Sequence, residues 1–292
     1  MAGISTNRTN IALPTEVSSD ILQKTQEQSA IMQLARKIVL PGNGVTIPMI
    51  TGDPEAAWVD ETAKKPVSNP SLSKKVMQAY KLAVIVPFSD EFRRDLKSLY
   101  DALVARLPLA LAKEFDKTVF CGAPAGTTLT NMDTFVNCTA QNLTNDPYGA
   151  LVAADTDIAT NGGILDGYVI SPQCKGLLLA AKDGNERPLF INNVAEGAIP
   201  MILGATTKVS RGAYKAGSAS APDIIGVAGD WSQAMYGTVE GVKIGIADQA
   251  TLTIGNEQVN LWEHNMFAVR AEIEVGFRAD TTVFNLLTRT HV

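Results

Sequence analysis

Residues 55–90 read EAAWVDETAKKPVSNPSLSKKVMQAYKLAVIVPFSD, and this stretch decides the fold. Its first part, residues 55–75, is polar and rich in Lys and Pro, with too little apolar surface to fold onto a core of its own. Residues 76–86 are strongly β-prone, and we expect Pro87 to end that strand. A long hairpin that projects from a compact body can reach neighbouring molecules. The stretch therefore predicts assembly rather than catalysis.

The composition fits a globular protein with an aliphatic core. Of the 292 residues, 46% are hydrophobic, 6% aromatic and 19% charged, which leaves Ala, Val, Ile and Leu to fill most of the interior. This length allows one large domain or two of ordinary size. The net charge of -5 argues against a dedicated nucleic-acid binder, which normally has a basic face. It does not exclude a protein that encloses nucleic acid without gripping it.

The cysteines and the N-terminus indicate a reducing compartment. Cys121, Cys138 and Cys174 are odd in number and widely spaced, so we expect free, partly buried thiols rather than disulfides or a metal pair. The first ten residues lack the apolar region of a signal peptide, and no apolar run approaches ~18 residues. The sequence therefore predicts a protein of cytoplasmic origin with no membrane contact.

Helical and strand patterns alternate around the hairpin. We expect an arm whose helix begins at Thr15, an edge strand at residues 45–49 and a short helix at residues 89–95. A longer helix should follow, because Ser98 and Asp101 have capping-box spacing, with Pro108 inside it and a stop at residues 122–126. Residues 147–253 mix helices and strands without the regular repeat of a doubly wound sheet.

The last long strand has the clearest local pattern. Apolar and polar residues alternate from residue 267 to residue 278, which predicts one dry face and one wet or charge-paired face. The wet face carries Arg270, Glu272, Glu274 and Arg278. Because the chain ends soon after this strand, we expect it to return to the sheet that carries the long helix.

Motifs for catalysis or cofactor binding are nearly absent. The sequence has no Gly-rich phosphate or dinucleotide loop, no nucleophile elbow and no HExxH. We interpret His264 as a surface or hydrogen-bonded histidine, since no Cys, Asp or second His lies at ligand spacing. Glu272 and Glu274 fit cross-strand ion pairs better than an acid–base pair. We therefore expect no catalytic residue, no metal and no cofactor.

Charged and aromatic residues in and after the hairpin are the candidates for subunit contacts. The basic pairs are interleaved with acidic residues, which favours a solvated, ion-paired surface, then salt bridges between subunits, and last phosphate binding. Trp58 is either a packing residue of the hairpin or an anchor on a neighbour. The candidate set is Trp58, Asp60, Glu61, Lys64, Lys65, Lys74, Lys75, Arg93 and Arg94.

The order of these elements resembles the major capsid proteins of tailed bacteriophages, which have the Hong Kong 97-type (HK97-like) fold. Residues 59–91 look like their extended hairpin loop and the approach to the spine helix, and residues 262–272 look like the closing strand of their peripheral domain. The resemblance implies an α+β fold. Its parts would be an N-terminal arm (1–43), the hairpin loop with flanking strands (44–87), a peripheral domain (88–146 and 254–292) and an axial domain (147–253).

The resemblance also implies a function and partners. The chain would self-assemble into pentamers and hexamers of an icosahedral shell in the virion, enclosing packaged double-stranded DNA without sequence-specific binding. The hairpin would lie across the adjacent subunit and the arm would clasp neighbours. Portal and decoration proteins would be further partners. The chain starts close to the arm, without the helical scaffolding segment that some members carry and cleave. Either scaffolding is a separate protein, which Met1 favours, or the sequence is that of a processed product.

Some members of this family form a covalent bond between a hairpin lysine and an asparagine of another subunit, assisted by a glutamate. By position, Lys74 (or Lys75), Asn265 and Glu272 fall roughly where those residues would lie. Simple polar contacts between subunits are the alternative role for these three residues.

Two other functions stay open from the sequence. An encapsulin-type compartment shares the fold but houses a cargo enzyme instead of DNA. A small carboxylate-dependent enzyme would use Glu272 or Glu274 and would need a deep pocket in a soluble monomer.

Overall fold

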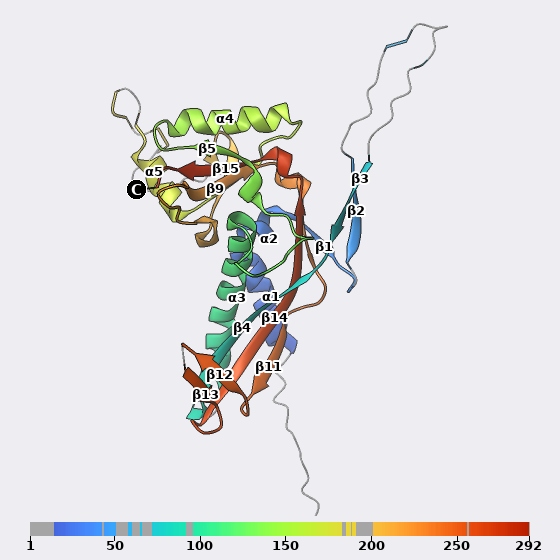
Figure 1. Cartoon of the computed structure of the whole chain (residues 1–292), viewed down its shortest axis with the longest axis vertical. Helices are drawn as coiled ribbons and strands as arrows, with labels where there is room; N and C mark the ends of the chain where they lie inside the picture. The colour runs from blue at the N-terminus through green and yellow to red at the C-terminus, as the bar shows by residue number, and fades with distance from the viewer. Residues whose placement is uncertain are drawn as a thin grey trace, which may run out of the picture.

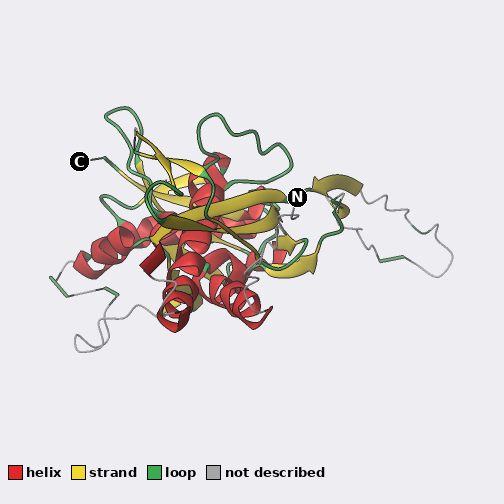
Figure 2. Ribbon diagram, turned by 90° about the horizontal axis from the view of Figure 1, so that it is seen from below, coloured by secondary structure: helices red, strands yellow, loops and turns green. Residues whose placement is uncertain are grey.

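The computed structural model describes residues 15–42, 44–50, 58–59, 65, 72–91, 96–182, 185–187, 189–190, 201–255 and 257–291. In these residues, two large sheets share one body and a long helix runs beside the lower of them (Figure 1). Two further sheets have two strands each, and one of these is a hairpin that projects from the side. Figure 2 shows most helices gathered on one side of the long strands, with the hairpin extending away from both.

The elements occur in the following order. The helices are α1 (Thr15–Gln28), α2 (Ala30–Leu34), α3 (Leu96–Cys121), α4 (Pro147–Thr160) and α5 (Pro172–Ala180), with 3-10 turns η2 (Phe135–Asn137), η3 (Arg211–Ala213), η4 (Trp231–Gln233) and η5 (Thr281–Val283). The strands are β1 (Arg36–Val39), β2 (Val45–Ile50), β3 (Leu72–Met77), β4 (Tyr80–Ser89), β5 (Thr139–Asn142), β6 (Gly167–Ile170), β7 (Met201–Ile202), β8 (Ala205–Val209), β9 (Asp223–Gly229), β10 (Ala234–Thr238), β11 (Lys243–Ala247), β12 (Thr251–Ile254), β13 (Glu257–Asn260), β14 (Met266–Ala279) and β15 (Phe284–Arg289).

Strand β14 is the centre of a five-stranded sheet. Along one edge it pairs antiparallel with β4, and along the other it pairs antiparallel with β11 and β10, while β1 adds parallel to β10. The expected alternation of β14 is confirmed, because its apolar face is buried against helices α1 and α3. The buried residues of this contact include Phe267, Val269, Ala271 and Ile273 of the strand, Ile21 of α1, and Leu107 and Leu111 of α3.

The second sheet has six strands in the order β5-β15-β9-β6-β8-β7, with α4 lying along its upper side in Figure 1. Its central strands β6 and β9 are buried at every position, as their continuous apolar sequences require. Helices α4 and α5 both begin with a capped turn that contains a proline. Asp146 accepts a hydrogen bond from the Gly149 N–H at the start of α4, and Ser171 accepts one from the Cys174 N–H at the start of α5.

Five aromatic rings join the two sheets. The Phe135 ring lies at the centre of the group, with ring centroids 4.6 Å from Phe284 of β15 and 5.6 Å from Phe277 of β14. Trp231 of η4 is 5.8 Å away and Phe120 of α3 is 5.9 Å away. All five side chains are buried. The cluster therefore makes one core out of two sheets whose strands do not pair with each other.

Several local expectations about the hairpin and the long helix are wrong. The returning strand is interrupted at Gln78 and Ala79, so β3 belongs to the hairpin and β4 to the five-stranded sheet. Strand β4 also passes through Pro87 to Ser89. A proline fits there because, among the described strands, β4 pairs only with β14, so the missing N–H falls on the outer edge.

Helix α3 begins at Leu96, so Ser98 lies inside it rather than at its cap. It contains Pro108 and ends at Cys121 before Gly122, as expected, and Gly122 has a left-handed φ of 92°. The arm is not one helix, because Ser29 separates α1 from α2. Of the short helix expected at residues 89–95, residues 92–95 lie outside the described part.

The sheets cross the expected domain boundaries. Strands β10 and β11, expected in the axial domain, pair with β14 in the five-stranded sheet. Strands β5 and β15, expected in the peripheral domain, lie in the six-stranded sheet. Turn η5 carries the chain from the end of β14 directly into β15, so two strands that are consecutive in the sequence belong to different sheets. Sequence position is a poor guide to sheet membership here.

Candidate assembly interface

The β2–β3 hairpin projects from the side of the body (Figure 1). Its two strands pair antiparallel from Val45–Met77 to Ile50–Leu72 and pair with no other described strand. An isolated two-stranded hairpin is only marginally stable in water, so contact with another surface would stabilise it. The side chains of Lys65 and Lys74 are exposed. The predicted contact residues Asp60, Glu61, Lys64, Arg93 and Arg94 lie outside the described residues.

Trp58 has a fully exposed side chain, at 105% of its reference area. It therefore makes no packing contact within the described chain. A fully exposed indole ring is available to pack against another molecule. Of the two roles considered for Trp58, the anchor on a neighbouring molecule is the one that agrees with this exposure.

The two lysines of β3 have different surroundings. The ammonium of Lys75 donates to the Ala279 carbonyl at 2.8 Å and lies 3.3 Å from the Asp133 carboxylate. Lys74 is exposed, because adjacent residues of a strand point to opposite faces. Lys75 is thus used inside the subunit, and Lys74 is the lysine of the pair that a neighbour can reach.

Arg278 completes the contact between the hairpin and the body. Its guanidinium binds Asp133 at 2.7 Å and donates two hydrogen bonds to the Val76 carbonyl, at 2.8 and 2.6 Å. Only 10% of the Arg278 side chain is exposed, so this ion pair is far better shielded than the surface pair expected from its position on the wet face. We call Lys75, Asp133 and Arg278 the hairpin clamp. No pattern in the sequence pointed to Asp133.

The carboxylates on β14 form ion pairs at the surface. Glu274 lies 3.7 Å from Lys81 of the paired strand β4, which confirms the expected cross-strand pair. Glu272 lies 3.1 Å from Arg270 on its own strand. Asn265 is exposed just before the strand in the left-handed region, at φ 51°, a conformation that asparagine tolerates better than most residues. Its carbonyl accepts a hydrogen bond from the Asp90 N–H at 2.9 Å.

The two histidines have structural partners. His264 is exposed, and its Nδ1 lies 2.9 Å from the Asn260 carbonyl, in agreement with the expected surface role. His291 lies 2.7 Å from the Asp223 carboxylate, which also binds Arg289 at 2.9 Å. A hydrogen bond from the Gly217 N–H, followed by His291 and Arg289, lowers the pKa of Asp223 to about 2. Asp223 thus ties the end of β15 to the start of β9.

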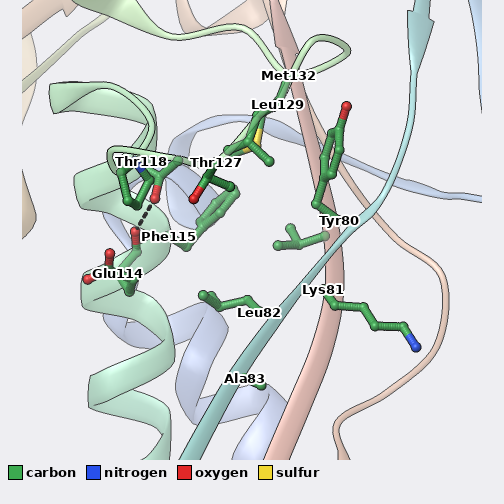
Figure 3. Close-up of a pocket in the computed structure, with 12 residues that line it drawn as sticks. Tyr80, Lys81, Leu82, Ala83, Glu114, Phe115, Thr118, Thr127, Leu129 and Met132 are labelled. Carbon is green, nitrogen blue, oxygen red and sulfur yellow. Dashed lines mark hydrogen bonds between the residues drawn. The ribbon is translucent and has the colours of Figure 1, made fainter.

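A pocket of about 290 Å³ lies between β4, α3 and the loop after α3 (Figure 3). Its lining is largely apolar and includes Leu82, Phe115 and Met132. The Lys81 side chain points away from the pocket, and the Thr118 hydroxyl donates to the Glu114 carbonyl at 2.8 Å. Glu272 and Glu274 do not line this space. Neither candidate carboxylate therefore belongs to this pocket.

Three further observations concern the described residues. The cysteines are free and buried, as expected, and burial raises the pKa of Cys121 to about 11 and those of Cys138 and Cys174 to about 12. Within the same residues, no group of His, Cys, Asp and Glu is arranged to hold a metal ion. None of the helices described has both the length and the apolarity needed to cross a membrane.

Sequence comparison places the chain among capsid proteins. The family described as "Phage capsid family" matches residues 9–280. The chain belongs to the phage capsid family. A "Probable major capsid protein gp17" of Mycobacterium phage L5 is 29% identical over 296 residues, covering 94% of this chain and 89% of the relative. A "Major capsid protein" of Staphylococcus phage 80alpha is 26% identical over 286 residues, covering 93% of this chain and 83% of the relative.

Solved structures support the same fold. A chain from Gordonia phage Cozz superposes with a TM-score of 0.70 at 20% identity, covering 91% of this chain and 87% of that one. A chain from Mycobacterium phage Ogopogo gives a TM-score of 0.69 at 20% identity, covering 90% and 92%. The fold is thus the α+β fold of HK97-like phage capsids. As a capsid protein, the chain is a structural component of the virion that associates with copies of itself, and neither the compartment nor the enzyme alternative is favoured.

Proposed function

We propose that this chain is the major shell subunit of a tailed phage, forming the pentamers and hexamers of an icosahedral head around packaged double-stranded DNA. The observation that carries the proposal is the projecting β2–β3 hairpin with fully exposed Trp58, in a chain that matches the capsid family over residues 9–280. Stable shells need large buried interfaces, and extended elements supply such area at little cost in mass.

The sheets suggest how the subunit is divided. We assign the five-stranded sheet with α3 to the peripheral domain, and the six-stranded sheet with α4 and α5 to the axial domain around the capsomer axis. This moves β10 and β11 to the peripheral domain and β5 and β15 to the axial domain. The arm, with α1 packed along α3, would continue toward neighbouring subunits.

The remaining partners follow from the same proposal. Synthesis would take place in the host cytoplasm, with a separate scaffolding protein, a portal and a decoration protein as partners of the shell. The DNA would be enclosed without sequence-specific contacts, which agrees with a chain whose net charge is -5 rather than strongly positive.

Assembly of the purified protein tests the proposal. Light scattering should detect particles far larger than a 31.1 kDa monomer, and negative-stain electron microscopy of the heaviest fraction should show closed shells or rings of five or six subunits. Co-expression with the phage's scaffolding protein is the control if the protein alone remains small. A monodisperse monomer at all concentrations and salts, with and without the scaffold, would contradict the proposal.

A covalent bond between subunits is a narrower part of the same proposal. Lys74 is the lysine available for it, with Asn265 as the acceptor and Glu272 as the assisting carboxylate, because Lys75 is bound inside the subunit. If the bond forms, particles boiled in detergent and reductant should run as a ladder of multimers, and Lys74→Arg should abolish the ladder. A single monomer band from mature particles would end this hypothesis.

A further inference from the structure

Two glycines lie opposite each other where the hairpin meets the body. Gly237 of β10 and Gly276 of β14 are paired in register. A Cβ atom on Gly276 would lie 2.6 Å from the Gln78 carbonyl oxygen, and one on Gly237 would lie 2.5 Å from the Leu40 side chain. A side chain at position 276 would clash with backbone, and one at position 237 would require the Leu40 side chain to move. The two segments that join the hairpin to the body, here called its legs, contain Leu40 before β2 and Gln78 after β3. Both legs pack against the flat surface of the glycine pair, which we call the glycine seat.

An apolar contact holds the legs on this seat. Leu40 and Met77 are fully buried and form a small cluster, separate from the two larger cores of the body. The Leu40 N–H donates to the Thr238 carbonyl at 3.0 Å. Gly44, at φ 82°, lets the first leg turn back, since a Cβ there would lie 2.7 Å from the Met77 carbonyl oxygen.

The hairpin clamp adds a second contact beside the glycine seat, because Gly276 and Arg278 are two residues apart and so lie on the same face of β14. Arg278 binds the Val76 carbonyl of β3 and the Asp133 carboxylate together, and Lys75 of β3 binds Asp133 and the Ala279 carbonyl. Asn131 extends the contact, because its side-chain amide donates to Gln78 Oε1 at 3.1 Å. The second leg is thus held through both its backbone and its side chains.

We propose that the glycine seat, the Leu40–Met77 contact and the clamp form a joint that fixes the hairpin at one angle to the body before subunits meet. The inference rests on the proposed function, since the angle decides where the hairpin lands on an adjacent subunit. A small rotation at two short legs would displace the far end of the hairpin by a large distance. An ordered joint also lowers the entropy lost on assembly. Gly276 and Arg278 are therefore positioning residues for shell closure.

Two variants and two matched controls separate the joint from general stability. Gly276→Ala places a methyl group against the Gln78 carbonyl, whereas Gly245→Ala, on the same sheet, has no atom closer than 3.9 Å to its new Cβ. Arg278→Gln removes the guanidinium of the clamp, with its ion pair to Asp133 and its hydrogen bonds to the Val76 carbonyl. Arg270→Gln, on the same strand, removes only a surface ion pair to Glu272, with 56% of the Arg270 side chain exposed.

The measurement is a distance between the hairpin and the body. Spin labels would be attached to Lys74→Cys on β3 and Ile164→Cys on the body, where Ile164 is 77% exposed, in the full-length unassembled subunit. The three native cysteines are buried and should react slowly. Parent and controls should give one narrow distance distribution. Both joint variants should give a shifted distribution or one at least twice as broad. The same variants made without the two label cysteines, so that Lys74 is kept, should give at least tenfold fewer closed shells than the parent.

Each outcome decides the proposal. A parent distribution as broad as those of the variants, or variants with unchanged distances, would overturn the joint. Altered distances with shell yields equal to the parent would overturn its role in positioning. A loss of shells with equal loss of secondary structure in variants and controls would assign the effect to folding, against the proposal. If the parent itself never assembles, the proposed function fails, while the distances still test the joint.

Discussion

Replacing Phe135 with alanine should lower the free energy of unfolding by about 4 kcal/mol, since removing a fully buried aromatic side chain costs roughly 3–5 kcal/mol. Phe135 is 0% exposed, and its ring contacts the rings of Phe120, Trp231, Phe277 and Phe284. These four residues come from both sheets, from α3 and from η4. The cavity would therefore open where the two sheets meet, a place that cannot collapse by moving one strand.

Urea unfolding of the unassembled subunit, followed by circular dichroism, measures the effect. Phe135→Leu, which keeps most of the volume, should cost about 1–1.5 kcal/mol. Tyr148→Ala on the outer face of α4, where the tyrosine is 49% exposed, should change stability by less than about 0.5 kcal/mol. A loss below about 1 kcal/mol for Phe135→Ala would mean that the two sheets do not depend on this ring for their contact.

Replacing Asp116 with alanine should cost about 3 kcal/mol, because it leaves several buried donors without an acceptor at roughly 1–3 kcal/mol each. The Asp116 carboxylate, on α3, accepts hydrogen bonds from the hydroxyls of Ser29 at 2.6 Å and Ser210 at 2.7 Å, and from the Ala30 N–H at 3.0 Å. Ser29 is the break between the arm helices, and Ser210 precedes η3. One carboxylate thus connects the arm, the long helix and the six-stranded part.

The conservative variant Asp116→Asn separates shape from charge. Its amide can accept from one serine and donate to the other, so we expect a loss of about 1 kcal/mol at neutral pH. Equal losses for the alanine and asparagine variants in urea unfolding would contradict a role for these hydrogen bonds. The two variants should be compared as unassembled subunits, since assembly would add stability of its own.

The stability difference between the parent and Asp116→Asn should change with pH in a definite direction. Burial raises the pKa of Asp116 above its ordinary value of 3.8, against the lowering effect of its hydrogen bonds. Above pH 3.8, up to the folded-state pKa, the folded protein holds a proton that the unfolded chain has released, so this group favours folding at lower pH. Relative to Asp116→Asn, the parent should gain stability as the pH falls through that window. A constant difference between pH 7.5 and pH 4 would contradict the raised pKa.

The sequence by itself determined the features that depend on local chemistry. The polar stretch after Trp58, followed by a β-prone run, predicted a projecting hairpin, and the hairpin is present in β2 and β3. The alternation from Phe267 to Phe277 predicted the dry face of β14. Pro108 inside a helical pattern and Gly122 at its end were both placed correctly. Such signals need only the period of a helix or strand and the φ values that a residue allows.

The candidate contact residues were predictable in part. The exposure of Trp58 and Lys74 agrees with a contact role, but the inward orientation of Lys75 depends on Asp133 and the Ala279 carbonyl, which lie 58 and 204 residues away in the chain. The sequence alone does not show which of two adjacent lysines is exposed. Only the alternation of the strand and the position of a distant carboxylate separate the two.

Only the tertiary structure decided which segments meet. The membership of β10, β11, β5 and β15 in their sheets, the clamp on Asp133 and the buried contacts of Asp116 join residues far apart in the chain. The glycines at positions 237 and 276 look like weak points of two strands until the hairpin legs are seen to rest on them. Local sequence fixes the period and the turns of each element. Which faces, donors and acceptors become partners depends on the packing of the whole chain, because burial, not sequence distance, sets the cost of leaving them unmatched.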